Sequence, residues 1–140
     1  QEYEIARTCF SEAIALNGNL APAYFGLGAV EQSAGGDPGL ARELYLKAVE
    51  LNPSNPQFHH ALGNLLAAER DPDALAHFAA AAQLHPNREN LQRDFGNACL
   101  QLGQGEEGVD HLRLALEQNP DDAMASELLA RAERDNPGSP

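Results

Sequence analysis

One short pattern occurs three times and constrains the fold of this chain more than any other feature. Each copy begins with a large apolar residue followed by glycine, in the pairs Leu27-Gly28, Leu62-Gly63 and Phe95-Gly96. Each copy closes on a proline, at Pro53, Pro86 and Pro120. The glycines are 35 and 33 residues apart, and the prolines 33 and 34. A period near 34 residues is typical of stacked helical hairpins, in which every hairpin packs against its neighbours.

The starts of the helices are marked by capping residues. Asp37-Pro38, Asn55-Pro56 and Asp71-Pro72 each combine an N-cap side chain with a proline at the first helical position. Asn87 and Asp121 are the expected caps of two further helices. The pattern predicts eight helical segments, at residues 2–17, 20–34, 38–51, 56–69, 72–84, 88–102, 105–118 and 121–135.

Apolar residues recur at helical spacing within these segments, and small residues alternate with large ones. Ala41, Tyr45 and Ala48 form one such stripe, and Ala74 and Phe78 begin the next. Small residues let two helices approach closely, while large residues fill the space between layers. We therefore expect the stripes to form the core of an all-α protein.

These residues resemble the tetratricopeptide repeat (TPR), a hairpin of two helices. Its first helix carries the Leu-Gly pair, and a large residue before that pair is here Tyr24, His59 and Gln92. Its second helix carries a small residue and then a large one, here Ala41 and Tyr45, Ala74 and Phe78, and Gly108 and Leu112. Glu31 departs from the pattern, because the equivalent positions hold Leu66 and Cys99. The resemblance implies a right-handed α-solenoid, the TPR superhelix, whose concave wall consists of the first helices.

The resemblance also divides the chain, which we treat as a single TPR domain. The predicted parts are a half repeat at 1–18, full repeats at 21–55, 56–88 and 89–122, and a C-terminal capping helix at 123–136. In the half repeat, Gly18 stands where the other copies have proline. Because the half repeat lacks a first helix, we expect either that more repeats precede Gln1 or that this helix packs on another chain. Self-association through the half repeat is therefore one alternative.

Charge and composition exclude several classes of partner. The chain has 21 acidic and 9 basic residues, for a net charge of −12. Nucleic acids and anionic membrane surfaces require a basic footprint, so neither is expected as a partner. No signal peptide is visible, which favours a cytoplasmic location, although the start at Gln1 leaves a processed or exported fragment open. Cys9 and Cys99 fall in different repeats, and we expect two buried thiols rather than a disulfide.

Residues that differ between the copies are the candidates for ligand binding. The predicted peptide-binding residues on the concave wall are Phe25, Gln57, His60, Asn64, Asn90, Arg93, Asn97, Glu127 and Arg131. Asn64 and Asn97 occupy equivalent positions, and their amides can pair with a peptide backbone. They can equally be solvated or bonded to a neighbouring helix. The two arginines suit a carboxylate ligand or a salt bridge to Glu127. Phe25 is either an apolar anchor or packs against a preceding repeat.

Catalytic and metal chemistry are not expected. His59 and His60 are neighbours and point to different helix faces, and His77 and His111 would supply only half of a usual zinc site. Cys99 falls at a core position, where a nucleophile would be hidden. The sequence therefore predicts no enzyme activity, no metal and no cofactor.

Three functions remain open. The first is a non-catalytic scaffold that binds an extended peptide or partner helix in the concave groove of the TPR array. The second is the docking or substrate-recruitment portion of a larger enzyme or of a secretion or assembly factor. The third is TPR-mediated homo-oligomerisation. A repeat array presents a surface to protein partners, and this favours the first.

Overall fold

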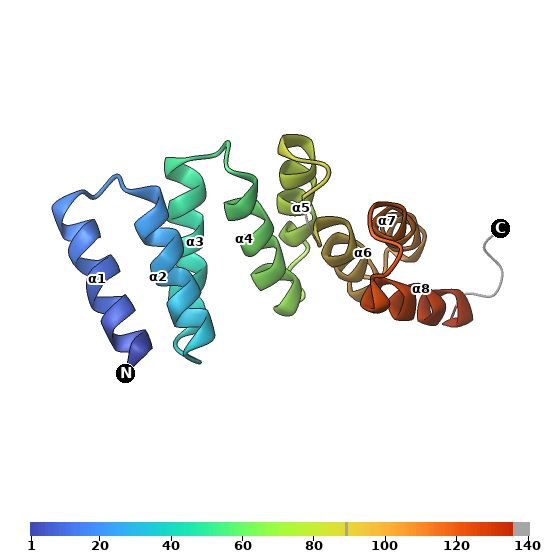
Figure 1. The fold of residues 1–140 in the computed structure, drawn as a ribbon, viewed down its shortest axis with the longest axis horizontal. Helices are drawn as coiled ribbons and strands as arrows, with labels where there is room; N and C mark the ends of the chain where they lie inside the picture. Colours follow the sequence, from blue (N-terminus) through green and yellow to red (C-terminus); the bar gives the residue numbers. More distant parts are fainter. Residues whose placement is uncertain (89, 136–140) are drawn as a thin grey trace. The chain divides into compact units, whose positions relative to one another are not determined.

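The protein is built from α-helices joined by short loops (Figure 1). The computed structural model describes residues 1–88 and 90–135, and no strand occurs in this part of the chain. The helices are α1 (Glu2–Leu16), α2 (Ala21–Ser33), α3 (Pro38–Leu51), α4 (Pro56–Ala68), α5 (Asp73–Leu84), α6 (Leu91–Gln101), α7 (Gly105–Gln118) and α8 (Ala123–Asp135). The predicted all-α class and the eight helical segments are therefore confirmed.

The chain forms two compact units, Gln1–Leu62 and Gly63–Pro140, and α4 begins in the first and ends in the second. In the first unit, α2 packs against both α1 and α3. In the second unit, α6 packs against α5, α7 and α8, and α7 also packs against α8. Among the described helices, none combines the length and the apolar character that crossing a bilayer requires.

Side-chain caps begin three helices where the sequence predicts them. A carboxylate oxygen of Asp37 accepts a hydrogen bond of 2.8 Å from the Gly39 amide at the start of α3. The side-chain oxygens of Asn55 and Asp71 accept equivalent bonds from the backbone amides of the residues two positions later. These bonds satisfy backbone donors that have no partner within the helix.

Two predicted caps are wrong. Helix α6 begins at Leu91 rather than at residue 88, and Asn87 does not cap it, because Asn90 precedes the helix with a left-handed φ of 62°. Asparagine tolerates this conformation better than most residues. At α8, the carboxylate of Asp122 rather than Asp121 accepts the bond from the Ala125 amide, because Asp122 lies three residues before that donor.

An aromatic cluster stabilises the first unit. The ring of Phe25 stacks on Phe58, with centroids 4.9 Å apart, and lies 5.5 Å from the ring of Tyr45. Phe58 packs with the small residues Ala21 and Ala48, which are buried. Helix α1, in contrast, has no fully buried residue. Its Cys9 is exposed, so the prediction of two buried thiols holds only for Cys99.

The core of the second unit repeats the same alternation of small and large residues. Phe78 is completely buried, and its ring stacks on Phe95 at 5.5 Å. In the same unit, Leu112 and Ala115 of α7 pack with Ala125 and Leu128 of α8.

Glycine permits a close crossing of α6 and α7. A Cβ atom added to Gly96 would lie 2.8 Å from Cγ of Leu112 and 2.9 Å from the carbonyl oxygen of Gly108. A Cβ on Gly108 would in turn lie 3.0 Å from the carbonyl oxygen of Gly96. Contacts under 3.0 Å are essentially never seen for real Cβ atoms, so the two helices meet where neither has a side chain.

A partly buried ion pair explains why Glu31 departs from the repeat pattern. Glu31 is only 6% exposed, and Arg7 of α1 holds its carboxylate with two bonds, of 2.7 Å from Nε and 3.2 Å from Nη2. The hydrogen bond to Glu31 raises the pKa of Arg7. The pair joins α1 to α2. At the position equivalent to Glu31, the other copies have the apolar Leu66 and the thiol Cys99.

The double replacement of Arg7 by methionine and Glu31 by leucine should be more stable than Arg7→Met alone. Arg7→Met leaves the buried carboxylate without its partner, which is costly, whereas two apolar residues of similar volume can replace a buried pair at little loss. Thermal unfolding followed by circular dichroism would compare the four members of the cycle. A double variant with a Tm below that of Arg7→Met would contradict this account.

The polar residues at the large position before each Leu-Gly pair share one role. Each donates a hydrogen bond to the carbonyl six residues earlier, where the preceding helix ends. The bonds run from Tyr24 Oη to Gly18 at 3.2 Å, from His59 Nε2 to Pro53 at 3.0 Å and from Gln92 Nε2 to Pro86 at 3.2 Å. Gly18 thus occupies the same place in the hydrogen-bond pattern as the two prolines.

Candidate functional site

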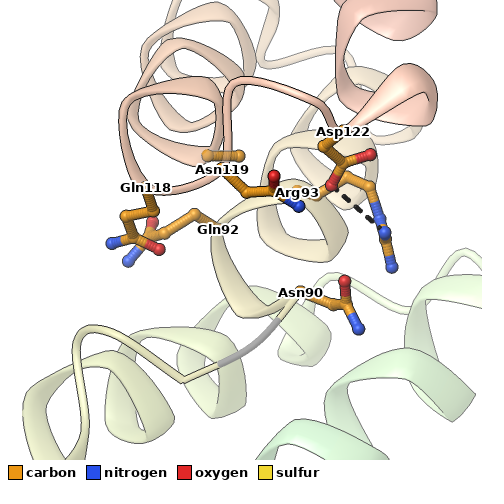
Figure 2. Close-up of a pocket in the computed structure, with 7 residues that line it drawn as sticks. Asn90, Gln92, Arg93, Gln118, Asn119 and Asp122 are labelled. Carbon is orange, nitrogen blue, oxygen red and sulfur yellow. Dashed lines mark hydrogen bonds and ion pairs between the residues drawn. The ribbon is translucent and has the colours of Figure 1, made fainter.

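A small pocket lies in the second unit, beside the N-terminal end of α6. It is lined by Asn90, Gln92, Arg93, Ala115, Gln118, Asn119 and Asp122, and Figure 2 shows their arrangement. Its volume of about 40 Å³ is far below the several hundred that a small-molecule site requires. The pocket suits the tip of a side chain or a segment of peptide backbone. Asn90 and Arg93 are the predicted binding residues that it brings together.

Arg93 is held by two aspartates. Its Nη1 donates to Asp122 at 3.2 Å, the bond drawn in Figure 2, and its Nε and Nη2 each donate to Asp94 at 3.1 Å. The Arg93 side chain is 19% exposed. The predicted salt bridge to Glu127 is therefore wrong for Arg93, because Asp94 and Asp122 lie closer. Two carboxylates around one guanidinium leave this cluster acidic, which disfavours an anionic ligand.

Asn64 and Asn97, the two asparagines predicted to lie on the concave wall, differ in their surroundings. Asn64 is exposed, and its amide lies 3.5 Å from the carboxylate of Asp94 on α6, at the limit of hydrogen bonding. Asn97 is half-buried and lies one helical turn beyond Arg93. Within the described residues of the second unit, the Asn97 side chain forms no hydrogen bond. Asn64 thus contacts a neighbouring helix, whereas the amide of Asn97 is available to a ligand.

Two of the other side-chain amides that line the pocket already form hydrogen bonds within the protein. Gln92 is buried and donates to the Pro86 carbonyl, and Gln118 donates to Pro86 and to Asn87, each at 3.3 Å. The exposed Asn90 side chain forms no hydrogen bond to the described residues. Gln118, Asn119 and Asp122 were missed in the sequence analysis. They lie at the C-terminal end of α7 and in the loop after it, and the packing of α7 beside α6 brings them to Asn90.

Helix α8 contributes the last two predicted residues of this unit. Glu127 and Arg131 are exposed, and neither forms an ion pair within the described part of the chain. The Glu127–Arg131 bridge considered for this helix is therefore not formed between them there.

Three predicted residues belong to the first unit. Phe25 packs on Phe58 and Tyr45 within this unit. His60 is only 7% exposed, so its ring is withdrawn from the surface. Gln57 is exposed near the start of α4. Of the three, Gln57 alone is well placed to meet a ligand without rearrangement.

Helix α1 exposes three large apolar side chains. Tyr3 is 50%, Ile5 65% and Leu16 89% exposed. Self-association through this helix stays a prediction.

Sequence comparison assigns the family. The model of the family described as "Tetratricopeptide repeat" matches residues 65–132, and a "TPR repeat" model matches residues 33–69. Together with the repeated hairpins, these matches show that the chain is a tetratricopeptide repeat protein. No curated protein matches it by sequence.

Solved structures confirm the α-solenoid class. MamA residues 41 to the end, from Desulfovibrio magneticus, has a TM-score of 0.88 at 19% identity, over 95% of this chain and 75% of that one. PilF from Pseudomonas aeruginosa has a TM-score of 0.85 at 23% identity, and the match covers 96% of this chain and 61% of that one. The OM64 TPR domain from Arabidopsis has a TM-score of 0.76 at 16% identity, and the match covers 81% of this chain and 94% of that one. Identities this low establish the shared fold alone.

Tetratricopeptide repeat proteins are in general non-catalytic scaffolds for protein–protein interaction. The small size of the pocket is consistent with that class.

Proposed function

We propose that the second unit binds the backbone of an extended peptide on a polar surface that we call the amide surface. This surface consists of Asn64, Asn90, Arg93, Asn97, Glu127 and Arg131. The observation that carries the proposal is the convergence of Asn90 and Arg93 on one pocket, with the unbonded amide of Asn97 one turn away. An amide offers both a donor and an acceptor, which is the pairing that a peptide group requires.

The charges around Arg93 favour a neutral or basic peptide. Asp94 and Asp122 together outweigh the charge of Arg93, and the whole chain carries a net charge of −12. A field of this sign attracts lysine and arginine side chains and speeds their association. The carboxylate ligand considered for Arg93 is therefore disfavoured.

Replacing Asn90 and Asn97 together by alanine should weaken binding of such a partner by about tenfold or more. Each lost hydrogen bond to a backbone group is worth about 1 kcal/mol, and tenfold corresponds to about 1.4 kcal/mol. Partners captured from a lysate of the source organism would be identified by mass spectrometry. The affinity of one of them for each variant would then be measured by isothermal titration calorimetry.

Gln83→Ala is the matched control, since it removes an exposed amide from α5, a helix that contributes no residue to the amide surface. It should leave the affinity within twofold. Equal affinities of the wild-type protein and the double variant for the captured partner would refute the amide surface as its binding site.

A further inference from the structure

Three side chains with metal-ligating atoms meet where α6 crosses α7. The sulfur of Cys99, a carboxylate oxygen of Glu107 and a ring nitrogen of His111 lie within 4.8 Å of one another. Cys99 belongs to α6, whereas Glu107 and His111 lie one turn apart on α7. From the sequence, Cys99 is expected in the core and His111 is paired only with His77, whereas Glu107 is not a candidate ligand. The crossing of the two helices places all three together.

The hydrogen bonds around His111 fix which ring nitrogen faces this cluster. The Gln92 amide nitrogen donates to the Pro86 carbonyl, so the Gln92 amide oxygen must point the other way. This oxygen lies 2.8 Å from Nδ1 of His111, and because it can only accept, Nδ1 carries the proton. Nε2 therefore presents a lone pair, on the side where Glu107 lies 4.0 Å away.

Packing holds the imidazole in this orientation. The ring of His111 stacks on Phe95 with centroids 3.8 Å apart and an interplanar angle of 24°. Gln92, which bonds to Nδ1, is itself only 3% exposed. A histidine that ligates a metal usually donates its other ring N–H to an oxygen acceptor, which fixes the tautomer as it is fixed here.

The other two side chains differ in exposure, because Cys99 is buried and Glu107 reaches solvent. Cys99 is completely buried, and this burial, with the charge of Glu107, raises the pKa of its thiol to about 12. The Glu107 side chain is 54% exposed and links the cluster to solvent. Ligand atoms around a tetrahedral zinc ion lie roughly 3.3–3.8 Å apart. The limit of 4.8 Å on their present separations exceeds this range by about 1 Å, so the three side chains have to move closer together on binding.

We propose that Cys99, Glu107 and His111 bind one thiophilic transition-metal ion, with Zn²⁺ as the best match, and that water fills the fourth position. A thiolate and an imidazole select such an ion over Mg²⁺ or Ca²⁺, which prefer oxygen ligands. On binding, the S–H bond of Cys99 breaks, its sulfur bonds to the metal, and the proton passes to solvent. The ion would cross-link α6 to α7, independently of any peptide on the amide surface.

Co²⁺ is the first probe, because a thiolate ligand gives it a near-ultraviolet charge-transfer absorption. Titration of chelator-treated full-length chain should produce this absorption at one ion per chain, and Zn²⁺ should abolish it by competition. Cys99→Ala should lose the absorption. Cys9→Ala, which removes the chain's other thiol, should keep it. Absence of the absorption in the wild-type protein, or its loss in Cys9→Ala but not in Cys99→Ala, would overturn the proposal.

A second pair of variants does not depend on the buried cysteine. Glu107→Gln changes an exposed side chain and should lower the Zn²⁺ affinity at least about tenfold, whereas the neighbouring Glu106→Gln should leave it within twofold. Zn²⁺ should also raise the Tm of the wild-type protein more than that of Glu107→Gln. Equal affinities of the two glutamine variants would overturn the assignment of Glu107 as a ligand.

Discussion

Replacing Phe78 with alanine should lower the free energy of unfolding by about 3–5 kcal/mol, the usual cost of removing a fully buried phenylalanine. No part of its side chain is exposed, and its ring stacks on Phe95. Small folded domains are stable by only about 5–15 kcal/mol, so this loss would consume a large part of the total. Urea unfolding followed by circular dichroism would measure it.

Two comparisons separate this effect from a general sensitivity to mutation. Phe78→Leu keeps most of the buried volume and should cost less than alanine does. Gln83→Ala, on an exposed position of the same helix, should change the free energy by no more than about 0.5 kcal/mol. If Phe78→Ala were as stable as Gln83→Ala, the stacked core described here would be wrong.

Gly96→Ala should destabilise the protein by about 1–3 kcal/mol, the usual cost of overpacking. The added methyl group would meet Leu112 at 2.8 Å and the Gly108 carbonyl at 2.9 Å. The backbone carbonyl cannot rotate away as a flexible side chain does, so α6 and α7 must separate. Alanine gains up to about 1 kcal/mol over glycine in helix propensity, and the steric cost has to exceed this gain. Chemical denaturation would give the net value.

Gly105→Ala is the matched control, because it lies in α7 and a Cβ there meets nothing within 4 Å. It should be neutral or slightly stabilising, by less than about 1 kcal/mol. Identical unfolding curves for the two alanine variants would show that the close crossing does not constrain Gly96.

The repeated pattern was sufficient to predict the helices, because its information is local. A cap such as Asp37 acts on an amide only two residues away, so its role could be read from the sequence. Two caps failed for equally local reasons: Asn90 adopts a left-handed backbone before α6, and of two adjacent aspartates Asp122 faces the helix end. Neither choice is visible in the order of residue types.

The candidate site was less predictable, because its contacts join residues distant in sequence. Arg93 pairs with Asp122, 29 residues later, and Glu31 pairs with Arg7, 24 residues earlier. Sequence analysis placed Arg93 on the wall but not the carboxylates that surround it. It likewise assigned Cys99 to the core without showing that Glu107 and His111 reach it across the helix crossing.

The bonds from Tyr24, His59 and Gln92 to the carbonyl six residues earlier have a consequence for how such repeats diverge. A phenol, an imidazole and an amide share little in size or polarity, yet each donates one hydrogen bond to the equivalent backbone carbonyl. The three copies thus keep a donor at this junction while the shape and hydrophobicity of the side chain change. A similarity score that rewards chemical likeness would treat these substitutions as drift, although the interaction they maintain is unchanged.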